Sequence, residues 1–533
     1  MYTARHRLLG RASLLCLVVL VLVACRLAPT ATPVPHWPTA TFAPTQPAPT
    51  ATPIPKTATP TAGAQRELII LHTNDEHGYL LPQESKDFYE GGAAYCAAQW
   101  LRQGYDPLAA EGHVLLLSGG DNWTGPAIST WFQGESAIEV MNAMGYRASA
   151  VGNHDFDAGQ EVLRRRIAQA KFPYLAANLY RQGTQEVVDF VRPYCVIEVN
   201  GVRVGIIGLA LRETPEVTAL KYLEGLEFGD YEPALRRWAP VARQEGAEIL
   251  IVLAHVPAQD LALLALKVQD LGISLFLGGH KHQARVTSAG DALVAAGSMG
   301  WRDYVWTRLV YDVAGHRVVA SRQELVTVLA LKSAGPPKVE PSITQTIEKW
   351  RTRAQAILGE VIGYTRSGLA QHSAALHNLL VDSWLWAYPQ ADIAMSNVGG
   401  FRAGLDSGEI TVGEIVGVFP FENYLVELVV SGEQVLQLLE RVGSDLVVGG
   451  LRRDPQGRII LLRDGSALDP KGTYRLLVTD FLYENAQYPF QSYDREPYQT
   501  SILWRQPVID WLRAHRTTPD HPLEQQLFAD QRP

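Results

Sequence analysis

The stretch ELIILHTNDEHG, residues 67–78, decides the fold of this 533-residue chain. It is an apolar run suited to a buried β-strand, and it ends in Asp75 with His77 close behind. Four later runs repeat the pattern, because each delivers Asp, Asn or His at its carboxyl end. They are HVLLLSGGD (113–121), ASAVGNHDFD (148–157), EILIVLAH (248–255) and SLFLGGHKH (274–282). Short apolar runs that alternate with helical stretches indicate α/β layers, with the ligand crevice at the carboxyl ends of the strands.

The polar residues behind these runs have the types and spacing of metal ligands. In extended backbone, residues two apart point to the same side, so Asp75 with His77 can direct a pair at one point, as can His280 with His282. Carboxylate, amide and imidazole groups together suit divalent ions such as Zn, Mn or Fe. A lone Asp after a strand is usually a helix cap, but the set as a whole predicts a metal centre. The candidate ligands are Asp75, His77, Asp121, Asn153, His255, His280 and His282.

The order and separation of these motifs carry a family resemblance. LHTNDEHG, SGGDNWTG, GNHDFD, an isolated strand-end His and GGHKH resemble the calcineurin-like metallophosphoesterase domain of the 5′-nucleotidase family. The resemblance implies a four-layer α/β/β/α sandwich, with a second, smaller α/β substrate-binding domain. It also implies two divalent metal ions with Asp121 as the bridge. One metal would take Asp75, His77, Asp121 and His282, and the other Asp121, Asn153, His255 and His280.

The expected chemistry is phosphoester hydrolysis. Two cations about 3.5 to 4 Å apart lower the pKa of a shared water, which attacks phosphorus as hydroxide. His154 and Asp157 match the family's catalytic pair. His154 would stabilise a phosphoryl oxygen or assist the leaving group, and Asp157 would fix its tautomer. Two positions depart from the family pattern, since Pro257 stands where Gly is usual and His282 where periplasmic members often have Gln.

The second half carries motifs for substrate binding. IAMSNVGGFRAGLDSGEITVGEIVGVFPFENYLVELVV, residues 393–430, resembles the C-terminal domain of the same family. An arginine can pair with phosphate or sugar oxygens, and a phenylalanine offers a face for a flat ring. The implied substrate contacts are Asn397, Arg402, Phe421, Asn423, Phe481 and Arg366. After Phe481 the family's Gly-Asp turn is replaced by Asn485, Ala486 and Gln487, which puts recognition of a nucleoside in doubt.

The amino-terminal residues predict export. Three arginines precede an apolar run, Ala12 to Ala24, that is shorter than a membrane span, and Leu-Val-Ala-Cys at 22–25 resembles a bacterial lipobox. An ordinary secretory peptide with a chance cysteine at Cys25 is the alternative. Residues 26–65 hold ten Pro and ten Thr, which indicates an extended stalk. The expected domains are a signal peptide (1–25), the stalk (26–65), a metallophosphoesterase domain (66–335), a linker helix (336–360) and a substrate-binding domain (361–533).

Two elements are expected at the boundary between the last two domains. YVWTRLVYDVAGHRVV, residues 304–319, predicts a hairpin that closes the first domain, with Gly315 in the turn. Within the linker, a helical stretch is expected from about 341 to 358.

Charge and motifs together limit the function. Residues 66–533 hold 42 basic and 55 acidic side chains, which argues against a nucleic-acid-binding surface. We expect a lipid-anchored, extracytoplasmic phosphohydrolase that acts on nucleotides. Alternatives on the same scaffold are a cyclic-nucleotide phosphodiesterase, a nucleotide-sugar pyrophosphatase or a thiosulfohydrolase. A non-catalytic surface receptor that binds nucleotides is the alternative outside the enzymes.

Overall fold

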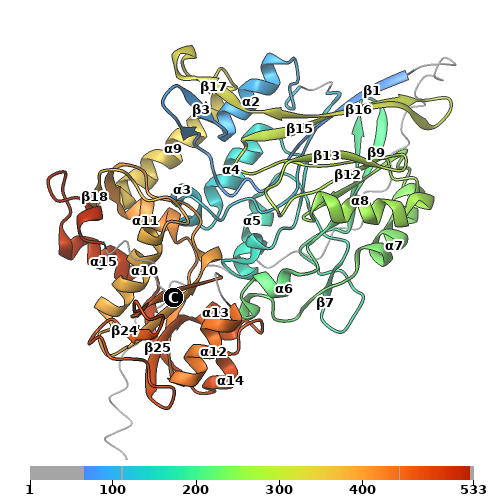
Figure 1. Ribbon diagram of the computed structural model, residues 1–533. Coiled ribbons are helices and arrows are strands. Elements are labelled where there is room, and N and C mark those ends of the chain that lie inside the picture. Colours follow the sequence, from blue (N-terminus) through green and yellow to red (C-terminus); the bar gives the residue numbers. More distant parts are fainter. Residues whose placement is uncertain (1–64, 110–111, 443–444, 528–533) are drawn as a thin grey trace, which may run out of the picture. The chain divides into compact units, whose positions relative to one another are not determined.

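The structure is a computed structural model that describes residues 65–109, 112–442 and 445–527 (Figure 1). The expected signal peptide, Cys25 and almost all of the stalk lie outside these residues. Within the described part of the chain, no helix combines the length and the apolar character needed to span a bilayer.

The first half of the chain is built on two six-stranded mixed sheets. The five apolar runs of the sequence are strands β1, β4 and β5 of one sheet and β11 and β12 of the other, and within each sheet these neighbours are parallel. The first sheet runs β16 (Arg317–Thr327), β15 (Asp303–Asp312), β1 (Gln65–Thr73), β4 (Val114–Ser118), β5 (Ala148–Ala150) and β6 (Tyr174–Leu175). The second runs β13 (Arg285–Ala289), β14 (Ala292–Ala296), β12 (Leu275–Leu277), β11 (Ile249–Ala254), β9 (Val202–Leu209) and β8 (Tyr194–Val199).

Alternate residues of each central strand pack into different cores, as the period of two requires. In β1, Ile69 and Leu71 face a core shared with helices, whereas Leu68 and Ile70 face the core between the sheets. In β11, Leu250 and Val252 likewise face a third core, which the second sheet shares with its own helices. Strands buried on both faces explain why these runs are almost continuously apolar.

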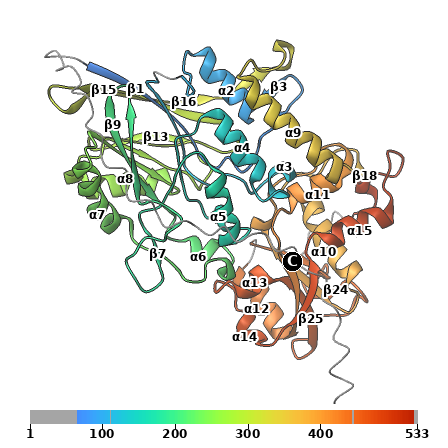
Figure 2. The same cartoon turned by 180° about the vertical axis from the view of Figure 1, so that it is seen from behind.

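Helices cover the outer face of each sheet. The first sheet is covered by α2 (Ala93–Arg102), α4 (Glu135–Met144) and α5 (Gln160–Gln169). The second is covered by α7 (Tyr231–Gln244) and α8 (Ala258–Lys267). Figures 1 and 2 show these two groups of helices on opposite sides of the paired sheets. The predicted four-layer α/β/β/α sandwich is therefore confirmed.

Smaller elements complete this half. Three short strands form one small sheet, and two more form another. The short strands are β2 (Gln83–Glu84), β3 (Phe88–Glu90), β17 (Leu329–Leu331), β7 (Leu179–Arg181) and β10 (Leu226–Phe228). The short helices are α3 (Ala127–Thr130), α6 (Thr214–Val217), η1 (His154–Phe156), η2 (Leu220–Tyr222), η3 (Gln269–Leu271) and η4 (Lys332–Ala334).

The hairpin and the helix predicted near the middle of the chain are both present. Strands β15 and β16 pair antiparallel, and Gly315 lies in the turn between them. The helix expected over about 341–358 is α9 (Pro341–Leu358), which starts with proline at its first position. Its Trp350 is fully buried in the core of the first sheet and its helices, where its ring lies 4.9 Å from that of Phe132. Helix α9 is thus tied to the first half by packing.

The second half has a five-stranded sheet with helices on both faces. In β19, Ala394 faces α10 and α15, whereas Ile393 and Met395 face α12, α13 and α14. The strands are β22 (Leu446–Gly449), β19 (Ile393–Asn397), β25 (Thr473–Thr479), β21 (Tyr424–Ser431) and β26 (Tyr498–Leu503). The helices are α10 (Ala374–Ala387), α15 (Gln506–His515), α12 (Gly432–Val442), α13 (Asp480–Glu484) and α14 (Phe490–Tyr493).

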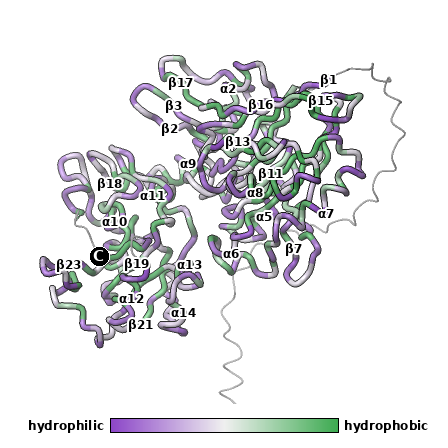
Figure 3. The backbone as a smooth tube through the Cα atoms, turned by 45° about the vertical axis from the view of Figure 1, so that its right-hand side comes forward, coloured by the Kyte–Doolittle hydropathy of each residue, from purple (hydrophilic) through white to green (hydrophobic). Residues whose placement is uncertain are grey.

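Short elements also flank this second sheet. Strand β18 (Val361–Thr365) pairs with β20 (Gly408–Thr411), and β23 (Leu451–Arg453) pairs with β24 (Ile459–Leu461). The remaining helices are α11 (Val412–Val418), η5 (Val398–Gly400) and η7 (Leu523–Gln525). Figure 3 shows hydrophobic residues concentrated in the inner strands of both halves and hydrophilic residues in the outer loops.

Candidate metal centre and substrate cavity

The predicted ligands follow the carboxyl ends of strands from both sheets. Asp75 follows β1, Asp121 follows β4 and Asn153 follows β5 in the first sheet. His255 directly follows β11, and the pair His280 and His282 follows β12, in the second. The candidate centre therefore lies where the corresponding edges of two stacked sheets meet.

One cluster contains Asp75, His77 and His282. The Nε2 atoms of the two histidines are 3.0 Å apart, and Oδ1 of Asp75 lies 3.3 Å from Nε2 of His282 and 3.8 Å from Nε2 of His77. Asp75 and His77 are buried, and His282 is 29% exposed at its side chain. Two imidazole nitrogens and one carboxylate oxygen thus point at a common space, the donor set of a borderline divalent ion.

A second cluster contains Asp121, His255 and His280. Nε2 of His255 lies 3.0 Å from Oδ2 of Asp121, and the same oxygen is 3.9 Å from Nε2 of His77 in the first cluster. Asn153 joins this group, because its Oδ1 lies 3.0 Å from Nδ1 of His280. Asp121 therefore stands between the two clusters, as expected of a bridging carboxylate.

The hydrogen bonds around the clusters leave ligand atoms free for metal. Oδ2 of Asp75 accepts from the side-chain amide of Asn74 and the backbone N–H of His280, whereas buried Oδ1 has no hydrogen-bond partner among the described residues. Nδ1 of His77 and of His255 each contact a backbone carbonyl, those of Thr124 and Gly119, at 2.8 and 2.9 Å. Such contacts fix the tautomer and aim Nε2 at the centre. The residues present fit two divalent cations.

Burial and neighbouring charges both shift the pKa values of titratable groups in the centre. Burial raises the pKa of Asp75, but the neighbouring imidazoles of His282 and His255 outweigh it and lower the pKa to about 2. Burial lowers the pKa of His255, but the carboxylate of Asp121 outweighs it and raises the pKa to about 10. A buried carboxylate that stays ionised and holds a proton on a neighbouring imidazole is a place where a cation can replace that proton.

The ligand residues adopt an unusual backbone conformation. Asp75, His77, Asp121, His280 and His282 all have positive φ angles, between 46° and 75°. This left-handed region is uncommon outside glycine, although Asp and His are among the residues that tolerate it, and it costs about 1 kcal/mol or more each. Gly152 adds a close approach, since a Cβ there would lie 2.1 Å from Oδ1 of Asp121. Strained backbone conformations that cluster in one region are typical of a functional site.

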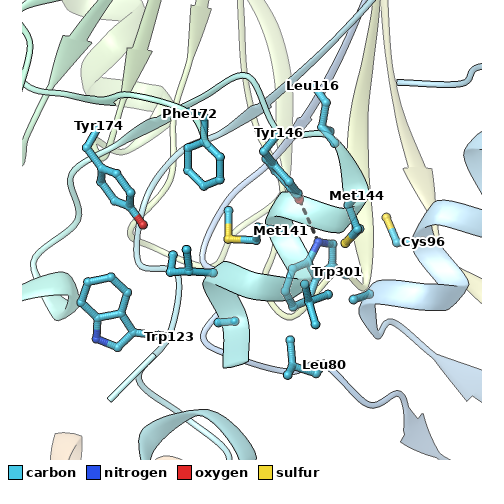
Figure 4. Packing of buried hydrophobic residues seen from close by; sticks show 14 of the residues in the cluster. Leu80, Cys96, Leu116, Trp123, Met141, Met144, Tyr146, Phe172, Tyr174 and Trp301 are labelled. Atoms are coloured by element: carbon cyan, nitrogen blue, oxygen red, sulfur yellow. Dashed lines mark hydrogen bonds between the residues drawn. The ribbon is translucent and has the colours of Figure 1, made fainter. Parts of the chain in front are cut away.

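A network of buried polar side chains packs next to the ligand residues, and the sequence analysis did not predict it. The carboxylate of Glu76 accepts hydrogen bonds from Thr73, Ser118 and Asn122. Thr73 in turn bonds the hydroxyl of Tyr146, which accepts from the indole of Trp301 at 2.9 Å inside the aromatic core (Figure 4). Burial raises the pKa of Glu76 to about 7. Its signal was present, since Glu76 and Asn122 stand inside the quoted motifs next to Asp75 and Asp121.

His154 and Asp157 form the expected pair. Nδ1 of His154 lies 2.8 Å from Oδ2 of Asp157, and both side chains are about 85% buried. Burial lowers the pKa of His154, but the charges of Asp157 and Asp121 outweigh it, so that the pKa is raised. The backbone N–H of His154 donates to Asp121, which holds the pair against the second cluster.

Residues of the second half reach this centre. A guanidinium nitrogen of Arg402 lies 3.4 Å from Nε2 of His77, and the ring of Phe421 is stacked against that of His154 with centroids 5.7 Å apart. A cavity of about 360 Å³ lies between the candidate centre and the second half. It is lined by residues of the centre and by five predicted substrate contacts, Asn397, Arg402, Phe421, Asn423 and Phe481.

Arg366 is the predicted contact that the structure does not bring to the cavity. Its side chain is exposed, and its guanidinium donates to the carbonyl of Pro519 at 2.9 Å. The segment that departs from the family pattern does reach the cavity, since Asn485 and Gln487 line it together with Tyr488. The side-chain amide of Asn485 donates to the carbonyl of Glu216, at 3.2 Å, across to the first half.

Two residues that the sequence reading missed hold Phe421 in place. The backbone carbonyl of Phe421 accepts from the indole of Trp504 at 2.8 Å and from the guanidinium of Arg505 at 2.7 Å. Both side chains are buried, and Arg505 also faces the carbonyls of Phe419 and Pro420 at 3.4 Å. Trp504 and Arg505 lie outside the sequence motifs that carried the prediction, so no pattern indicated a role for them.

Two family models match this chain. Residues 68–284 match the calcineurin-like phosphoesterases, and residues 355–493 match the 5′-nucleotidase C-terminal domain. The chain belongs to the 5′-nucleotidase family. The calcineurin-like phosphoesterases use two divalent metal ions, and the two clusters supply the sites for them. In this member of the 5′-nucleotidase family, a metallophosphoesterase domain thus precedes a 5′-nucleotidase C-terminal domain.

Relatives of the chain agree with this placement. It is 25% identical over 483 residues to the trifunctional nucleotide phosphoesterase protein YfkN of Bacillus subtilis, covering 78% of this chain but only 32% of that protein, so it spans about a third of YfkN. It is 26% identical over 490 residues to the snake venom 5′-nucleotidase of Gloydius brevicauda, covering 80% of this chain and 82% of that one. The crystal structure of the 5′-nucleotidase precursor from Thermus thermophilus has a TM-score of 0.72 and 25% identity, over 85% of this chain and 97% of that one.

Proposed function

We propose that this protein is an extracytoplasmic 5′-nucleotidase that releases phosphate from nucleotides. The observation that carries the proposal is that Phe421 and Arg402 of the second half line one cavity. From there Phe421 contacts His154, and Arg402 contacts His77, in the candidate centre. A ring-binding face and a cationic group thus line the same cavity as residues of the metal clusters. Nucleotides combine a flat ring with phosphate, which is the pair of features that this cavity presents.

Each residue then has a defined role. Asp75, His77, Asp121, Asn153, His255, His280 and His282 would hold two divalent cations, and Asp121 faces both clusters. When bound, the cations activate water and neutralise the phosphoryl oxygens. Arg402 pairs with a phosphoryl oxygen that comes within reach of its guanidinium. His154, held by Asp157, stabilises the oxygen that leaves phosphorus or supplies its proton.

The nucleoside occupies the aromatic part of the cavity. Phe421 and Phe481 line it and provide faces for a base, and Asn397 and Asn423 provide polar groups beside them. Asn485 and Gln487 replace the carboxylate that the family uses to hold ribose, and Asn485 is already bonded to Glu216. We therefore expect a modest preference for nucleosides over other ring-bearing phosphate esters.

An ion pair joins the two halves beside the cavity. Nζ of Lys221 lies 2.8 Å from Oδ2 of Asp480, whose other oxygen accepts the backbone N–H groups of Tyr424 and Phe481. Asp480 is only 11% exposed at its side chain, so the pair is partly shielded from water. This ion pair ties the segment that carries Phe481 to the segment that borders the metal-side wall of the cavity.

The extracytoplasmic location rests on the amino-terminal sequence. The arginine-rich start, the apolar run from Ala12 to Ala24 and the Leu-Val-Ala-Cys element favour a lipid anchor at Cys25. The Pro/Thr-rich residues that follow would hold the catalytic part away from the membrane. An enzyme so placed meets phosphate esters outside the cell.

A phosphate-release screen tests the function. Purified protein is loaded with Mn or Zn and given nucleoside monophosphates, cyclic nucleotides, nucleotide sugars and sugar phosphates. We expect the highest kcat/KM with nucleoside monophosphates, and loss of that activity after chelation and in the Asp75→Asn variant. Activity on sugar phosphates that equals or exceeds that on nucleoside monophosphates would contradict the assignment to nucleotides.

A further inference from the structure

A buried asparagine, Asn74, joins the two sheets at the edge where the ligands lie. It follows β1 of the first sheet and is only 3% exposed. Its side chain reaches Gly297 and Ser298, which follow β14 of the second sheet. The side-chain oxygen accepts the backbone N–H of Gly297 at 2.7 Å, and the side-chain nitrogen lies 3.2 and 2.8 Å from the carbonyl oxygens of Gly297 and Ser298. One side chain thus connects the ligand-bearing edges of both sheets.

The same amide group contacts the ligand Asp75. Its nitrogen lies 2.6 Å from Oδ2 of Asp75, and the backbone N–H of His280 donates to that oxygen at 2.9 Å. Because two donors occupy Oδ2, the other oxygen, Oδ1, is the one that faces the metal side. Oδ1 lies 3.8 Å from Nε2 of His77 and 3.3 Å from Nε2 of His282. Asn74 therefore helps to fix the rotation of this carboxylate.

Three glycines leave the space that Asn74 occupies. A Cβ atom at Gly119 would lie 2.7 Å from the Cβ of Asn74, and one at Gly279 would lie 3.2 Å from it. A Cβ atom at Gly297 would lie 3.1 Å from Oδ1 of Asn74. Gly119 follows β4 of the first sheet, whereas Gly279 and Gly297 follow β12 and β14 of the second. Backbone from both sheets is thus packed closely around this one side chain.

The segment that Asn74 contacts is also held by the first sheet. The backbone N–H and the hydroxyl of Ser298 donate to Asp303, at 2.8 and 2.5 Å, and Asp303 begins β15 next to β1. The backbone N–H of Gly300 donates to the backbone carbonyl of Asp75 at 2.9 Å. Residues 297–300 therefore give Asn74 a fixed anchor beside the ligand.

We propose that Asn74 is a positioning residue that sets the affinity of the cluster of Asp75, His77 and His282 for its metal ion. Asn74 does not line the cavity, so it acts through Asp75 and not on the substrate. Partners that orient a metal ligand typically contribute a factor of about 10 to 100 to metal affinity. The inference rests on metal binding at the candidate centre, whichever phosphate ester is cleaved there.

The effect should fall on one of the two ions. Asn74 is hydrogen-bonded to a ligand of the first cluster, and within the described ranges its side chain makes no hydrogen bond to Asp121, His255 or His280. In Asn74→Ala, one ion should bind about 10 to 100 times more weakly, and the affinity for the other should stay within about threefold. The measurement is competition between the metal-loaded, full-length protein and a chromophoric chelator, with no substrate present.

Asn178→Ala is the matched control. Asn178 is also fully buried, and its side chain likewise bonds backbone groups, the N–H and carbonyl of Ala210 and the carbonyl of Gly229, at 2.8, 2.9 and 3.0 Å. None of these groups belongs to a ligand residue. Asn178→Ala should therefore lower Tm, as Asn74→Ala does, but leave both metal affinities unchanged.

A double variant identifies the ion. Asn74 and His282 act on the same ion, so Asn74→Ala combined with His282→Ala should lose less affinity than the product of the two single losses. Asn74→Ser, which also removes the amide but leaves less empty space, should weaken the same ion and carries the test if Asn74→Ala does not fold.

Three results would overturn the proposal. They are equal weakening of both ions, unchanged affinities in the folded Asn74 variant, and the same loss of affinity in Asn178→Ala. Losses that multiply in the double variant would assign Asn74 to the other ion and would contradict it as well. Normal metal binding by a protein that hydrolyses no nucleotide would instead count against the proposed function alone.

Discussion

Removal of the Phe421 ring should separate recognition of the base from chemistry at phosphorus. The ring lines the cavity and stacks against His154 at 5.7 Å with 22° between the planes. Its backbone is held independently by Trp504 and Arg505, which bond its carbonyl at 2.8 and 2.7 Å. Phe421→Ala should therefore delete the ring without moving the loop, and its effect should report the contact with the base.

The magnitude follows from stacking energies. A base stacked on an aromatic side chain is stabilised by about 1–3 kcal/mol, as judged by alanine substitution. Since about 1.4 kcal/mol is a factor of ten, kcat/KM for AMP should fall roughly 5- to 150-fold. Ribose 5-phosphate shares the phosphate and the sugar but has no base. Its kcat/KM should fall only a few fold, through the lost contact with His154, which contributes about 1 kcal/mol.

The assay is phosphate release from AMP and from ribose 5-phosphate under the same metal loading. Phe421→Leu keeps apolar volume but lacks the aromatic face, so it should lie between the wild type and Phe421→Ala on AMP. The ratio of the two kcat/KM values is the quantity to follow, because it cancels any common effect on the metals. A ratio that does not change in Phe421→Ala would refute the reasoning and remove Phe421 from base recognition.

Three further outcomes are expected. Asp121→Asn should lower the content of both metals and reduce turnover more than Asp75→Asn does, because Oδ2 of Asp121 faces both clusters; metal analysis showing two bound ions and full activity in Asp121→Asn would rule out the bridge. His154→Ala should keep both metals and lower kcat by roughly 10² to 10⁴; if metal is lost instead, His154 is a ligand. Cys25→Ser should move the protein from the membrane to the soluble fraction, and continued membrane association would argue against a lipid anchor at Cys25.

The sequence predicted the parts of the fold that depend on local pattern. Continuous apolar runs predicted buried strands, and both the hairpin around Gly315 and the helix over about 341–358 followed from turn and capping signals. The ligand cluster was predictable because each strand delivers its polar residue at the same edge. The division of the five strands between two stacked sheets was not, since the pattern of a strand buried on both faces is the same in either sheet. That arrangement came from the family resemblance.

The sequence was least informative where long-range contacts decide the outcome. Arg366 has the residue type of a ligand contact, but its loop is tied to Glu524 and Pro519 instead of the cavity. Arg505 acts through three backbone carbonyls that are about 85 residues away in sequence, and no motif encodes such a contact. Glu76 is a different case. Its position between the ligand residues Asp75 and His77 is evident from the sequence, but its burial is not.

The apolar layer between the two sheets acts as a spacer that sets the distance between the ligand residues of one sheet and those of the other. Ile70 and Leu117 on one side and Leu253 on the other are fully buried in this layer, each a few residues before a ligand. Since cores respond to changes as small as one methylene, a conservative substitution here would shift one set of ligands against the other. The first measurable effect of such a substitution would be an altered metal affinity rather than unfolding. A substitution in this layer can thus change the affinity of the centre for a metal, with every ligand residue unchanged.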